Sequence, residues 1–204
     1  MLNRRSFGMA AASAVAISVF APFALVRPAA ADAAALEIFI KGLSTRAITD
    51  LSAATTDKER AARLLPILQE FFDMPALARH TLGAYWRRAT PEEQAEYVEV
   101  FTQYMSAVYG KRFSEYSGQT LAVQRVREDG ERATIFTIVE GAEGKPRVDW
   151  DVAVLDGKQM ITDVRVEGLS LAETHRQEFT SVISSKGGKV QALIDILKKK
   201  VASL

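Results

Sequence analysis

Apolar residues recur every three to four positions through the first half of the chain, and this spacing predicts helices. The strongest case begins at Thr90, where Thr90, Pro91 and Glu93 form a Thr-x-x-Glu capping box with proline at the first helical position. The apolar face of this helix spans roughly 180°, whereas a surface helix needs roughly 100°. That face consists of Tyr97, Val98, Val100, Phe101, Tyr104, Met105, Val108, Tyr109 and Tyr116. The polar side consists of Glu99, Thr102, Gln103 and Ser106. So broad a face predicts a helix deep in a core, or one that also lines an apolar cavity.

Three further helices are expected before this one. The first runs from Leu36 to Leu51, and the second begins at Asp57 with Pro66 as a bend or break. Asp73 is placed to cap a short third helix that ends at Gly83.

From Gly118 onward the apolar period changes from 3.6 to 2, which predicts strands. Asp129-Gly130, the segment 141–144 and Asp156-Gly157 are turn signals between them. The expected sheet is a four-stranded antiparallel meander with one dry face and one solvated face. The dry face takes Leu121, Val123, Ile135, Thr137, Val139, Val148, Trp150, Val152, Val154, Met160, Thr162, Val164 and Val166. The solvated face takes Asp149, Asp151, Asp163 and Arg165.

Two helices close the chain, one over 170–185 and one from Lys189, separated by Gly187-Gly188. The predicted fold is therefore α+β, with helices packed on one side of a curved four-stranded antiparallel sheet. Such an arrangement can enclose an apolar pocket or a solid core.

The first 31 residues have the pattern of an export signal. Arg4 and Arg5 precede a low-charge run, and Ala29-Ala30-Ala31 provides an Ala-x-Ala cleavage site. The segment Asn3–Phe7 resembles the twin-arginine motif. We expect cleavage after Ala31, which leaves one domain over 32–204, although an uncleaved membrane anchor is the alternative.

The net charge and the absence of cysteine argue against several classes of function. Without Arg4, Arg5 and Arg27, 23 of the 26 basic residues remain against 25 acidic ones, a net charge of −2. Such a chain has no electrostatic reason to bind nucleic acid. The absence of cysteine excludes thiolate catalysis and cysteine-based zinc sites.

No residue pattern indicates catalysis or a metal site. His80 and His175 are the only histidines and lack a zinc-binding spacing. Asp149 and Asp151 are a candidate carboxylate pair, but their alternation with apolar residues favours the solvated face of a strand. We therefore expect no enzymatic activity, no cofactor and no metal.

Several segments together resemble the MlaC/toluene-tolerance family of periplasmic lipid-binding proteins. Leu82-Gly83-x-x-Trp86, Ala89-Thr90-Pro91 and Tyr116-x-Gly118-Gln119-Thr120 occur in the family's order. The segment 163–171 matches a strand-to-helix signature of the family, and Arg176, Phe179 and the Gly187 segment follow it. The similarity covers roughly residues 64–199. One departure is Gln159, at a position where the family usually has tryptophan.

The resemblance implies a soluble carrier that moves phospholipid across the periplasm. Its implied partners are an inner-membrane ABC transporter complex and an outer-membrane lipoprotein complex. Acyl chains would lie between the helices and the sheet. The residues expected to line that pocket are Phe72, Val98, Phe101, Met105, Val108, Phe136, Trp150, Val152 and Val164. Phe136 alternates out of phase with Ile135 and Val139 and is the exception to the dry-face pattern.

Two alternatives stay open at this point: a carrier of hopanoid-type lipid, and an adaptor with a solid core that carries nothing. We expect a monomer, because the chain has no long heptad seam. The candidate docking or headgroup-side charges are Arg87, Arg88, Lys111 and Arg112, each of which is otherwise a solvated surface residue.

Overall fold

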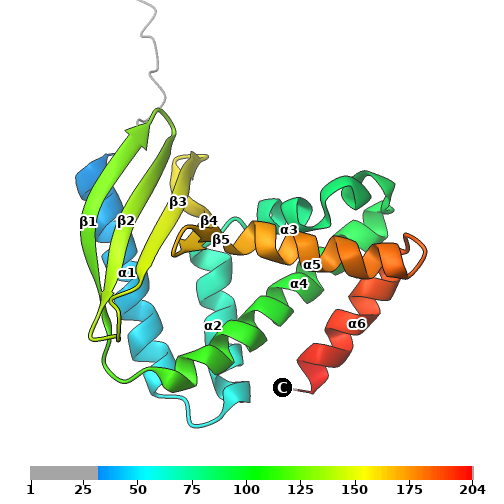
Figure 1. Ribbon diagram of the computed structural model, residues 1–204, viewed down its shortest axis with the longest axis horizontal. Coiled ribbons are helices and arrows are strands. Elements are labelled where there is room, and N and C mark those ends of the chain that lie inside the picture. Colours follow the sequence, from blue (N-terminus) through cyan, green and yellow to red (C-terminus); the bar gives the residue numbers. More distant parts are fainter. Residues whose placement is uncertain (1–31, 204) are drawn as a thin grey trace, which may run out of the picture.

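The computed structural model describes residues 32–203, so the expected export signal lies outside the described residues. Within that range, the chain forms six α-helices, five strands and two short 3-10 helices (Figure 1). The α-helices are α1 (Ala33–Ser52), α2 (Asp57–Phe71), α3 (Met74–Leu82), α4 (Pro91–Arg112), α5 (Leu171–Ser185) and α6 (Val190–Ala202). The 3-10 helices are η1 (Gly83–Arg88) and η2 (Phe113–Glu115). The strands are β1 (Thr120–Asp129), β2 (Arg132–Glu140), β3 (Arg147–Leu155), β4 (Lys158–Val166) and β5 (Leu169–Ser170).

The strands form one antiparallel sheet in the order β1-β2-β3-β4-β5. Figure 1 shows α1 behind the sheet, with α4 running diagonally below it and α5 and α6 extending to the other end of the molecule. Helix α1 contacts β1, whereas α2, α3 and α5 contact β4. The α+β prediction is confirmed, and the sheet has a fifth, two-residue strand that the sequence pattern did not indicate.

Local capping chemistry explains where the helices begin. The Glu93 amide donates to the Thr90 hydroxyl at 3.2 Å, and the Thr90 amide donates to the Glu93 carboxylate at 2.9 Å. Asp73 accepts from the Ala76 amide at 3.1 Å at the start of α3. These bonds satisfy amides that have no partner in the first turn of a helix. Both predicted helix starts are confirmed.

Pro66 lies inside α2 and does not break it, so the expected break at this residue is wrong. Proline removes one backbone hydrogen bond, to the carbonyl four residues earlier. That carbonyl belongs to Ala62, and both Ala62 and Pro66 are exposed, so water can satisfy the unpaired group.

Helix α4 is more enclosed than its sequence pattern indicates. Thr102 and Ser106, expected on the polar side, are 5% and 4% exposed. Their hydroxyls donate to carbonyls of α4 itself, at 2.7 Å to Val98 and 2.8 Å to Gln103. This internal bonding lets α2 cover a polar strip of α4 without leaving a buried hydroxyl unpaired.

Gly110 brings the backbones of α4 and α2 together. A Cβ atom at Gly110 would lie 2.9 Å from the backbone nitrogen of Ala61. We therefore expect Gly110→Ala to lower the free energy of unfolding by about 1–3 kcal/mol, because the helices must move apart. Urea denaturation measures this change.

Gly42→Ala is the matched control, since Gly42 lies in α1 with no atom within 4 Å of an added Cβ. That substitution should stabilise the protein by about 0.5–1 kcal/mol, through helix propensity alone. Equal effects at the two glycines would contradict the close-packing account.

A β-bulge corrects the register expected for β4. Trp150 pairs with Val164, but Val152 pairs with Ile161, so the pairing shifts by one residue at Thr162. Ile161 is fully buried, whereas Met160, which was expected on the dry face, pairs with Ala153 on the other face. A second shift between Val123 and Arg125 places Val126 opposite Ile135.

The outer face of the sheet is less solvated than expected. Asp149 is only 5% exposed and lies 3.3 Å from the guanidinium of Arg147. Asp151 accepts from Thr134 at 3.0 Å and pairs with Arg165. The prediction of a solvated Asp149 is therefore wrong: Arg147 of the same strand lies against the carboxylate, and Arg165 of β4 is the cross-strand partner of Asp149.

Candidate lipid pocket

An apolar pocket of about 360 Å³ lies between the helices and the inner face of the sheet. Its closed end is formed by buried side chains of α1, α2, α3 and α4. The main ones are Leu43, Leu51, Leu64, Ile67, Leu68, Met74, Leu77 and Phe101. Each is less than a tenth exposed, so this end is dry.

The other end of the pocket is partly exposed and carries the polar lining. These residues come from the end of α4, the segment between η2 and β1, the start of β1, the end of β4 and the first turns of α5. They are Tyr109, Tyr116, Gln119, Thr120, Asp163 and His175. Thr120 is exposed, and Tyr109, Tyr116, Gln119 and Asp163 are half-buried. We call this set the rim; all its members except the buried His175 are at least partly exposed, which makes it the open side of the pocket.

Five of the nine residues that the sequence suggested lie in the wall of this pocket: Phe72, Phe101, Met105, Trp150 and Val164. Phe101 and Met105 project from successive turns of α4. Trp150 is oriented by a hydrogen bond from its indole nitrogen to the Thr137 hydroxyl at 3.1 Å. Contact of these five with a lipid stays a prediction.

The other four side chains lie elsewhere. Val98 faces a separate groove between α2, α4 and the β3–β4 hairpin, and Val108 packs against the main core. Val152 is 2% exposed within the core and is absent from the pocket wall. Phe136 lies on the outer face of the sheet, opposite Asp149, with the Arg125 guanidinium 4.2 Å from its ring centroid. These four positions are therefore corrections to the pocket set.

Sequence reasoning missed the contribution of α1 and most of α2 to the pocket. Leu43, Ala47, Ile48 and Leu51 of α1 line it, yet their spacing is that of an ordinary buried stripe. The rim residues Gln119 and His175 were missed as well, because isolated polar residues gave no pattern. Tyr116 was indicated by the sequence, because it is the last residue of the broad apolar face that begins at Tyr97.

His175 and Tyr109 form a polar pair at the rim. The Tyr109 hydroxyl lies 3.1 Å from Nε2 of His175, and His175 is 8% exposed. The imidazole ring stacks on Phe179 with centroids 5.4 Å apart, while Tyr104 meets it edge-on. The nearest acidic group to Nδ1 is the Glu178 carboxylate at 3.7 Å. This pair is one of the few polar groups of the pocket wall that can form a hydrogen bond to a ligand.

The His175 imidazole should make stability depend on pH. Burial lowers its pKa below the ordinary 6.5; Glu178 opposes this shift, and Arg112 and Lys200 add to it. Below pH 6.5 the unfolded chain therefore binds a proton that the folded protein resists. We expect the free energy of unfolding to fall as the pH is lowered from about 7.5 to 5.5.

Urea denaturation of the protein and of His175→Gln across this range measures the effect. The free energy of unfolding of the variant should depend less on pH, because the imidazole that titrates is absent. Identical slopes in the two proteins would show that His175 does not carry this dependence.

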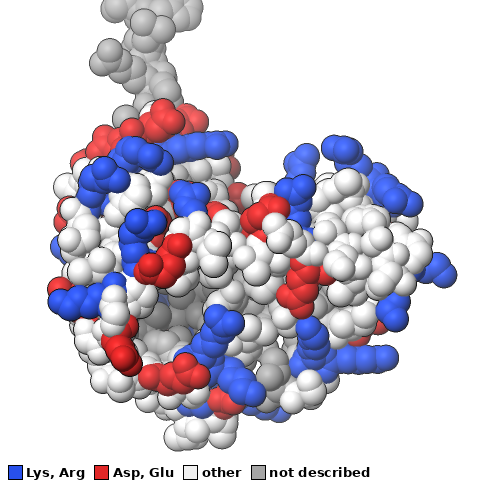
Figure 2. Space-filling model, in the orientation of Figure 1, with Lys and Arg blue, Asp and Glu red and all other residues white. Residues whose placement is uncertain are grey.

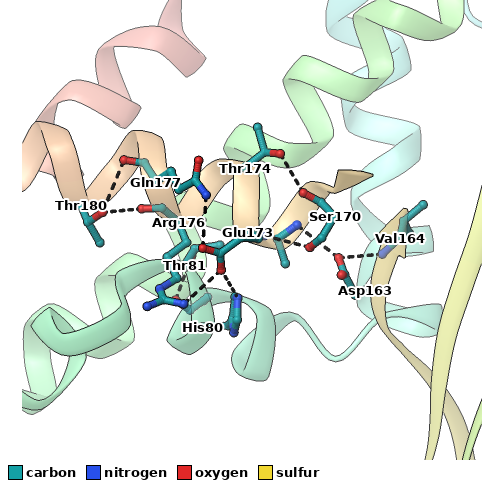
Figure 3. A network of polar contacts seen from close by, with 12 residues as sticks. His80, Thr81, Asp163, Val164, Ser170, Glu173, Thr174, Arg176, Gln177 and Thr180 are labelled. Carbon is teal, nitrogen blue, oxygen red and sulfur yellow. Dashed lines mark hydrogen bonds and ion pairs between the residues drawn. The ribbon is translucent and has the colours of Figure 1, made fainter. Parts of the chain in front are cut away.

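Asp163 connects the pocket wall to the start of α5. Its carboxylate accepts from the amides of Val164 at 2.8 Å and Ala172 at 3.2 Å (Figure 3). Ser170 caps the same helix by accepting from the Glu173 amide at 3.0 Å. The helix start therefore stabilises a carboxylate at the rim, where electropositive amides favour negative charge.

The four candidate docking charges fall into two separate groups. Lys111 and Arg112 lie in the last turn of α4, and the Arg112 guanidinium lies 5.3 Å from the ring centroid of the rim residue Tyr109. Arg87 and Arg88 lie in η1, just before the other end of α4. Since α4 has 22 residues, the groups are separated by about 33 Å along the helix. Only the first pair lies close to the open side of the pocket.

The polar groups of the pocket are few and do not form a metal-binding cluster. Among residues 32–203, no group of three or more His, Asp or Glu side chains is arranged to hold a metal ion. Within the same range, no helix is both long and apolar enough to cross a bilayer. The chemistry that the pocket offers is burial of apolar surface with a few hydrogen bonds at the rim.

Comparison with known proteins gives the same fold and a family. The family model for the MlaC protein matches residues 41–199. The toluene tolerance protein Ttg2D of Pseudomonas putida is 27% identical over 113 residues, which are 54% of this chain and 53% of that protein. The match therefore spans about half the length of this curated relative.

A solved structure, the phospholipid-binding protein from Ralstonia solanacearum in complex with a phospholipid, superposes with a TM-score of 0.70. The two chains are 20% identical, and the superposition covers 81% of this chain and 96% of that one. The likeness confirms the α+β architecture. Because the family model matches well over half of the sequence, the chain belongs to the MlaC family.

Proposed function

We propose that this protein is a non-enzymatic carrier that binds the acyl chains of phospholipid in the apolar pocket. The observation that carries the proposal is the pocket itself, about 360 Å³ of apolar space with a dry closed end and a polar rim. Small-molecule sites have volumes of roughly 300–1,000 Å³ and are mainly apolar with a few polar groups. The phospholipid named for the Ralstonia solanacearum protein of the same fold supports this ligand class.

The energetics favour an acyl chain over a charged ligand. Each buried methylene contributes about 0.8 kcal/mol, so ten methylenes contribute about 8 kcal/mol before the cost of ordering the chain. The closed end offers no group to compensate a buried charge. Acyl chains would therefore enter this end, and the polar headgroup would stay at the rim beside Tyr109 and His175.

The proposal includes a place of action and partners. The protein would work in the periplasm after export, as a monomer that shuttles lipid between an inner-membrane ABC transporter complex and an outer-membrane lipoprotein complex. Family membership and the export pattern of residues 1–31 support this part. A pocket that is open to solvent also favours a carrier over an adaptor with a filled core.

Native mass spectrometry of protein purified from its own periplasm tests the proposal. We expect a stoichiometric adduct with the mass of a phospholipid, which extraction and fragmentation then identify. A hopanoid-type adduct would change the ligand class, and a lipid-free chain would count against the carrier. Free fatty acid that accumulates from bound lipid would contradict the absence of enzymatic activity.

A further inference from the structure

A second, basic cleft lies on the surface outside the apolar pocket. It encloses about 320 Å³ between α3, η1 and α5. Its walls are Ala76, Arg79, His80, Gly83, Trp86, Arg87 and Arg176. None of these residues lines the apolar pocket, so the cleft is a separate feature of the surface.

The backbone at Gly83 allows the cleft to form. Gly83 has φ +54°, a conformation that favours glycine, where α3 ends and η1 begins. A Cβ atom there would lie 3.1 Å from Nε of Arg176, so glycine lets this guanidinium lie against the turn. The last turn of α3 and the last turn of η1 then place Arg79, His80 and Arg87 around the same space.

The positive charge of the cleft is only partly balanced. Glu173 pairs with Arg176 at 3.0 Å and with Nε2 of His80 at 3.3 Å, and Gln177 donates to it at 3.4 Å (Figure 3). Among residues 32–203, no acidic side chain forms an ion pair with Arg79 or Arg87. Two guanidinium groups therefore face the cleft without an internal anion.

Further basic side chains lie on the surface around the cleft. Arg88 lies 5.4 Å from the ring centroid of Tyr85, and its guanidinium lies against Gly188 in the α5–α6 turn. Lys186 and Lys189 flank that turn and are exposed. Figure 2 shows Lys and Arg side chains gathered over α3 and η1, whereas elsewhere on this face the two signs are mixed.

We propose that this cleft binds an acidic segment, rich in Asp or Glu, of a partner protein. The planar guanidinium fork of arginine matches a carboxylate bidentately, and arginine and tryptophan are typical anchors of protein interfaces. The half-buried Trp86 offers an apolar wall beside these groups. A concave site whose exposed arginines surround an apolar wall fits a protruding peptide segment better than the broad surface of a bilayer.

This inference goes beyond the proposed lipid carriage and can fail separately from it. Because no cleft residue lines the apolar pocket, although Arg176 directly follows the rim residue His175 in α5, an occupied cleft would leave the lining of the pocket unchanged. Lipid loading, read by native mass spectrometry, is therefore expected to be the same in variants of the cleft and in the unaltered protein.

Fluorescence anisotropy with a dye-labelled hexaglutamate peptide tests the proposal on the mature, lipid-loaded protein. We expect binding at low ionic strength that weakens with added salt. Arg79→Glu combined with Arg87→Glu should weaken binding about tenfold or more, the effect of losing two charge-assisted contacts. In NMR spectra, the indole signal of Trp86 should shift on peptide addition, while that of Trp150 in the pocket stays in place.

The matched control is Lys58→Glu combined with Lys158→Glu, which makes the same change in net charge at exposed positions outside the cleft. If both double variants lost the same amount of peptide affinity, the loss would be due to net charge alone, and the proposal of a binding site in the cleft would be wrong. Displacement of the peptide by inorganic phosphate but not by chloride of equal ionic strength would make phosphate the ligand instead. Failure to bind the peptide, together with Arg79- and Arg87-dependent binding to phosphatidylglycerol vesicles, would assign the cleft to a membrane surface.

Discussion

Val164→Trp is expected to expel lipid from the pocket while the protein stays folded. Val164 is a half-buried wall residue of the apolar pocket, so a larger side chain can enter space that an acyl chain would otherwise fill. Displacing about four methylenes would cost about 3 kcal/mol of binding free energy, which corresponds to a loss of affinity of roughly 200-fold. This prediction rests on the proposed carrier function.

Val166→Trp is the matched control for this experiment. Val166 lies two residues further along β4, is 36% exposed and is absent from the pocket wall. The two variants should have similar melting temperatures, but only Val164→Trp should lose the lipid adduct in native mass spectrometry. Retention of lipid in Val164→Trp would show that the acyl chain does not reach this part of the sheet.

The elements that the sequence predicted well are those determined by local chemistry. Thr90 with Glu93, and Asp73 with the first turn of α3, form caps within four residues of chain. Such interactions depend on spacing alone, and the helix starts could therefore be predicted from the pattern. The change of period at Gly118 likewise located β1 to within two residues.

The predictions of side-chain exposure and strand register failed where these depend on contacts with distant parts of the chain. A bulge at Thr162 turns Ile161 inward, and the alternation of β4 alone gives no sign of it. Thr102 and Ser106 have polar side chains, yet α2 covers them because their hydroxyls bond within α4. The polarity of a Ser or Thr in a helix therefore does not by itself predict exposure, because the hydroxyl can bond to a carbonyl of the same helix.

The pocket was harder to predict than the fold for a related reason. Leu43 and Leu51 of α1 and Phe101 of α4 lie on apolar stripes that are identical in pattern to core stripes. Whether a stripe faces packed atoms or empty space depends on how far apart the facing elements stand. The apolar faces of the helices and the strands were enough to predict five of the nine expected lining residues. Placing Phe136 correctly would have needed the register of the sheet, and placing Val152 would have needed its depth in the core.

Phe101 illustrates the overlap between core and pocket, and Phe101→Glu is expected to prevent stable folding. Phe101 is 1% exposed, stacks on Tyr97 with ring centroids 5.8 Å apart and meets Phe179 edge-on at 6.3 Å. Removing the ring alone would cost about 3–5 kcal/mol. An unpaired carboxylate in this environment adds several kcal/mol, while total stabilities of proteins are about 5–15 kcal/mol.

Two control variants separate loss of packing from the effect of charge in α4. Val98→Glu introduces the same charge one turn earlier, at a half-buried position that faces the groove between α2, α4 and the β3–β4 hairpin, and this variant should fold. Phe101→Leu keeps an apolar side chain and should melt at a lower temperature but still cooperatively. Circular dichroism melting of the three variants would show the order Val98→Glu, Phe101→Leu, Phe101→Glu from most to least stable. A near-native melting temperature for Phe101→Glu, with lipid absent, would mean that the carboxylate reaches water through the pocket, and Phe101 would then belong to the pocket wall more than to the core.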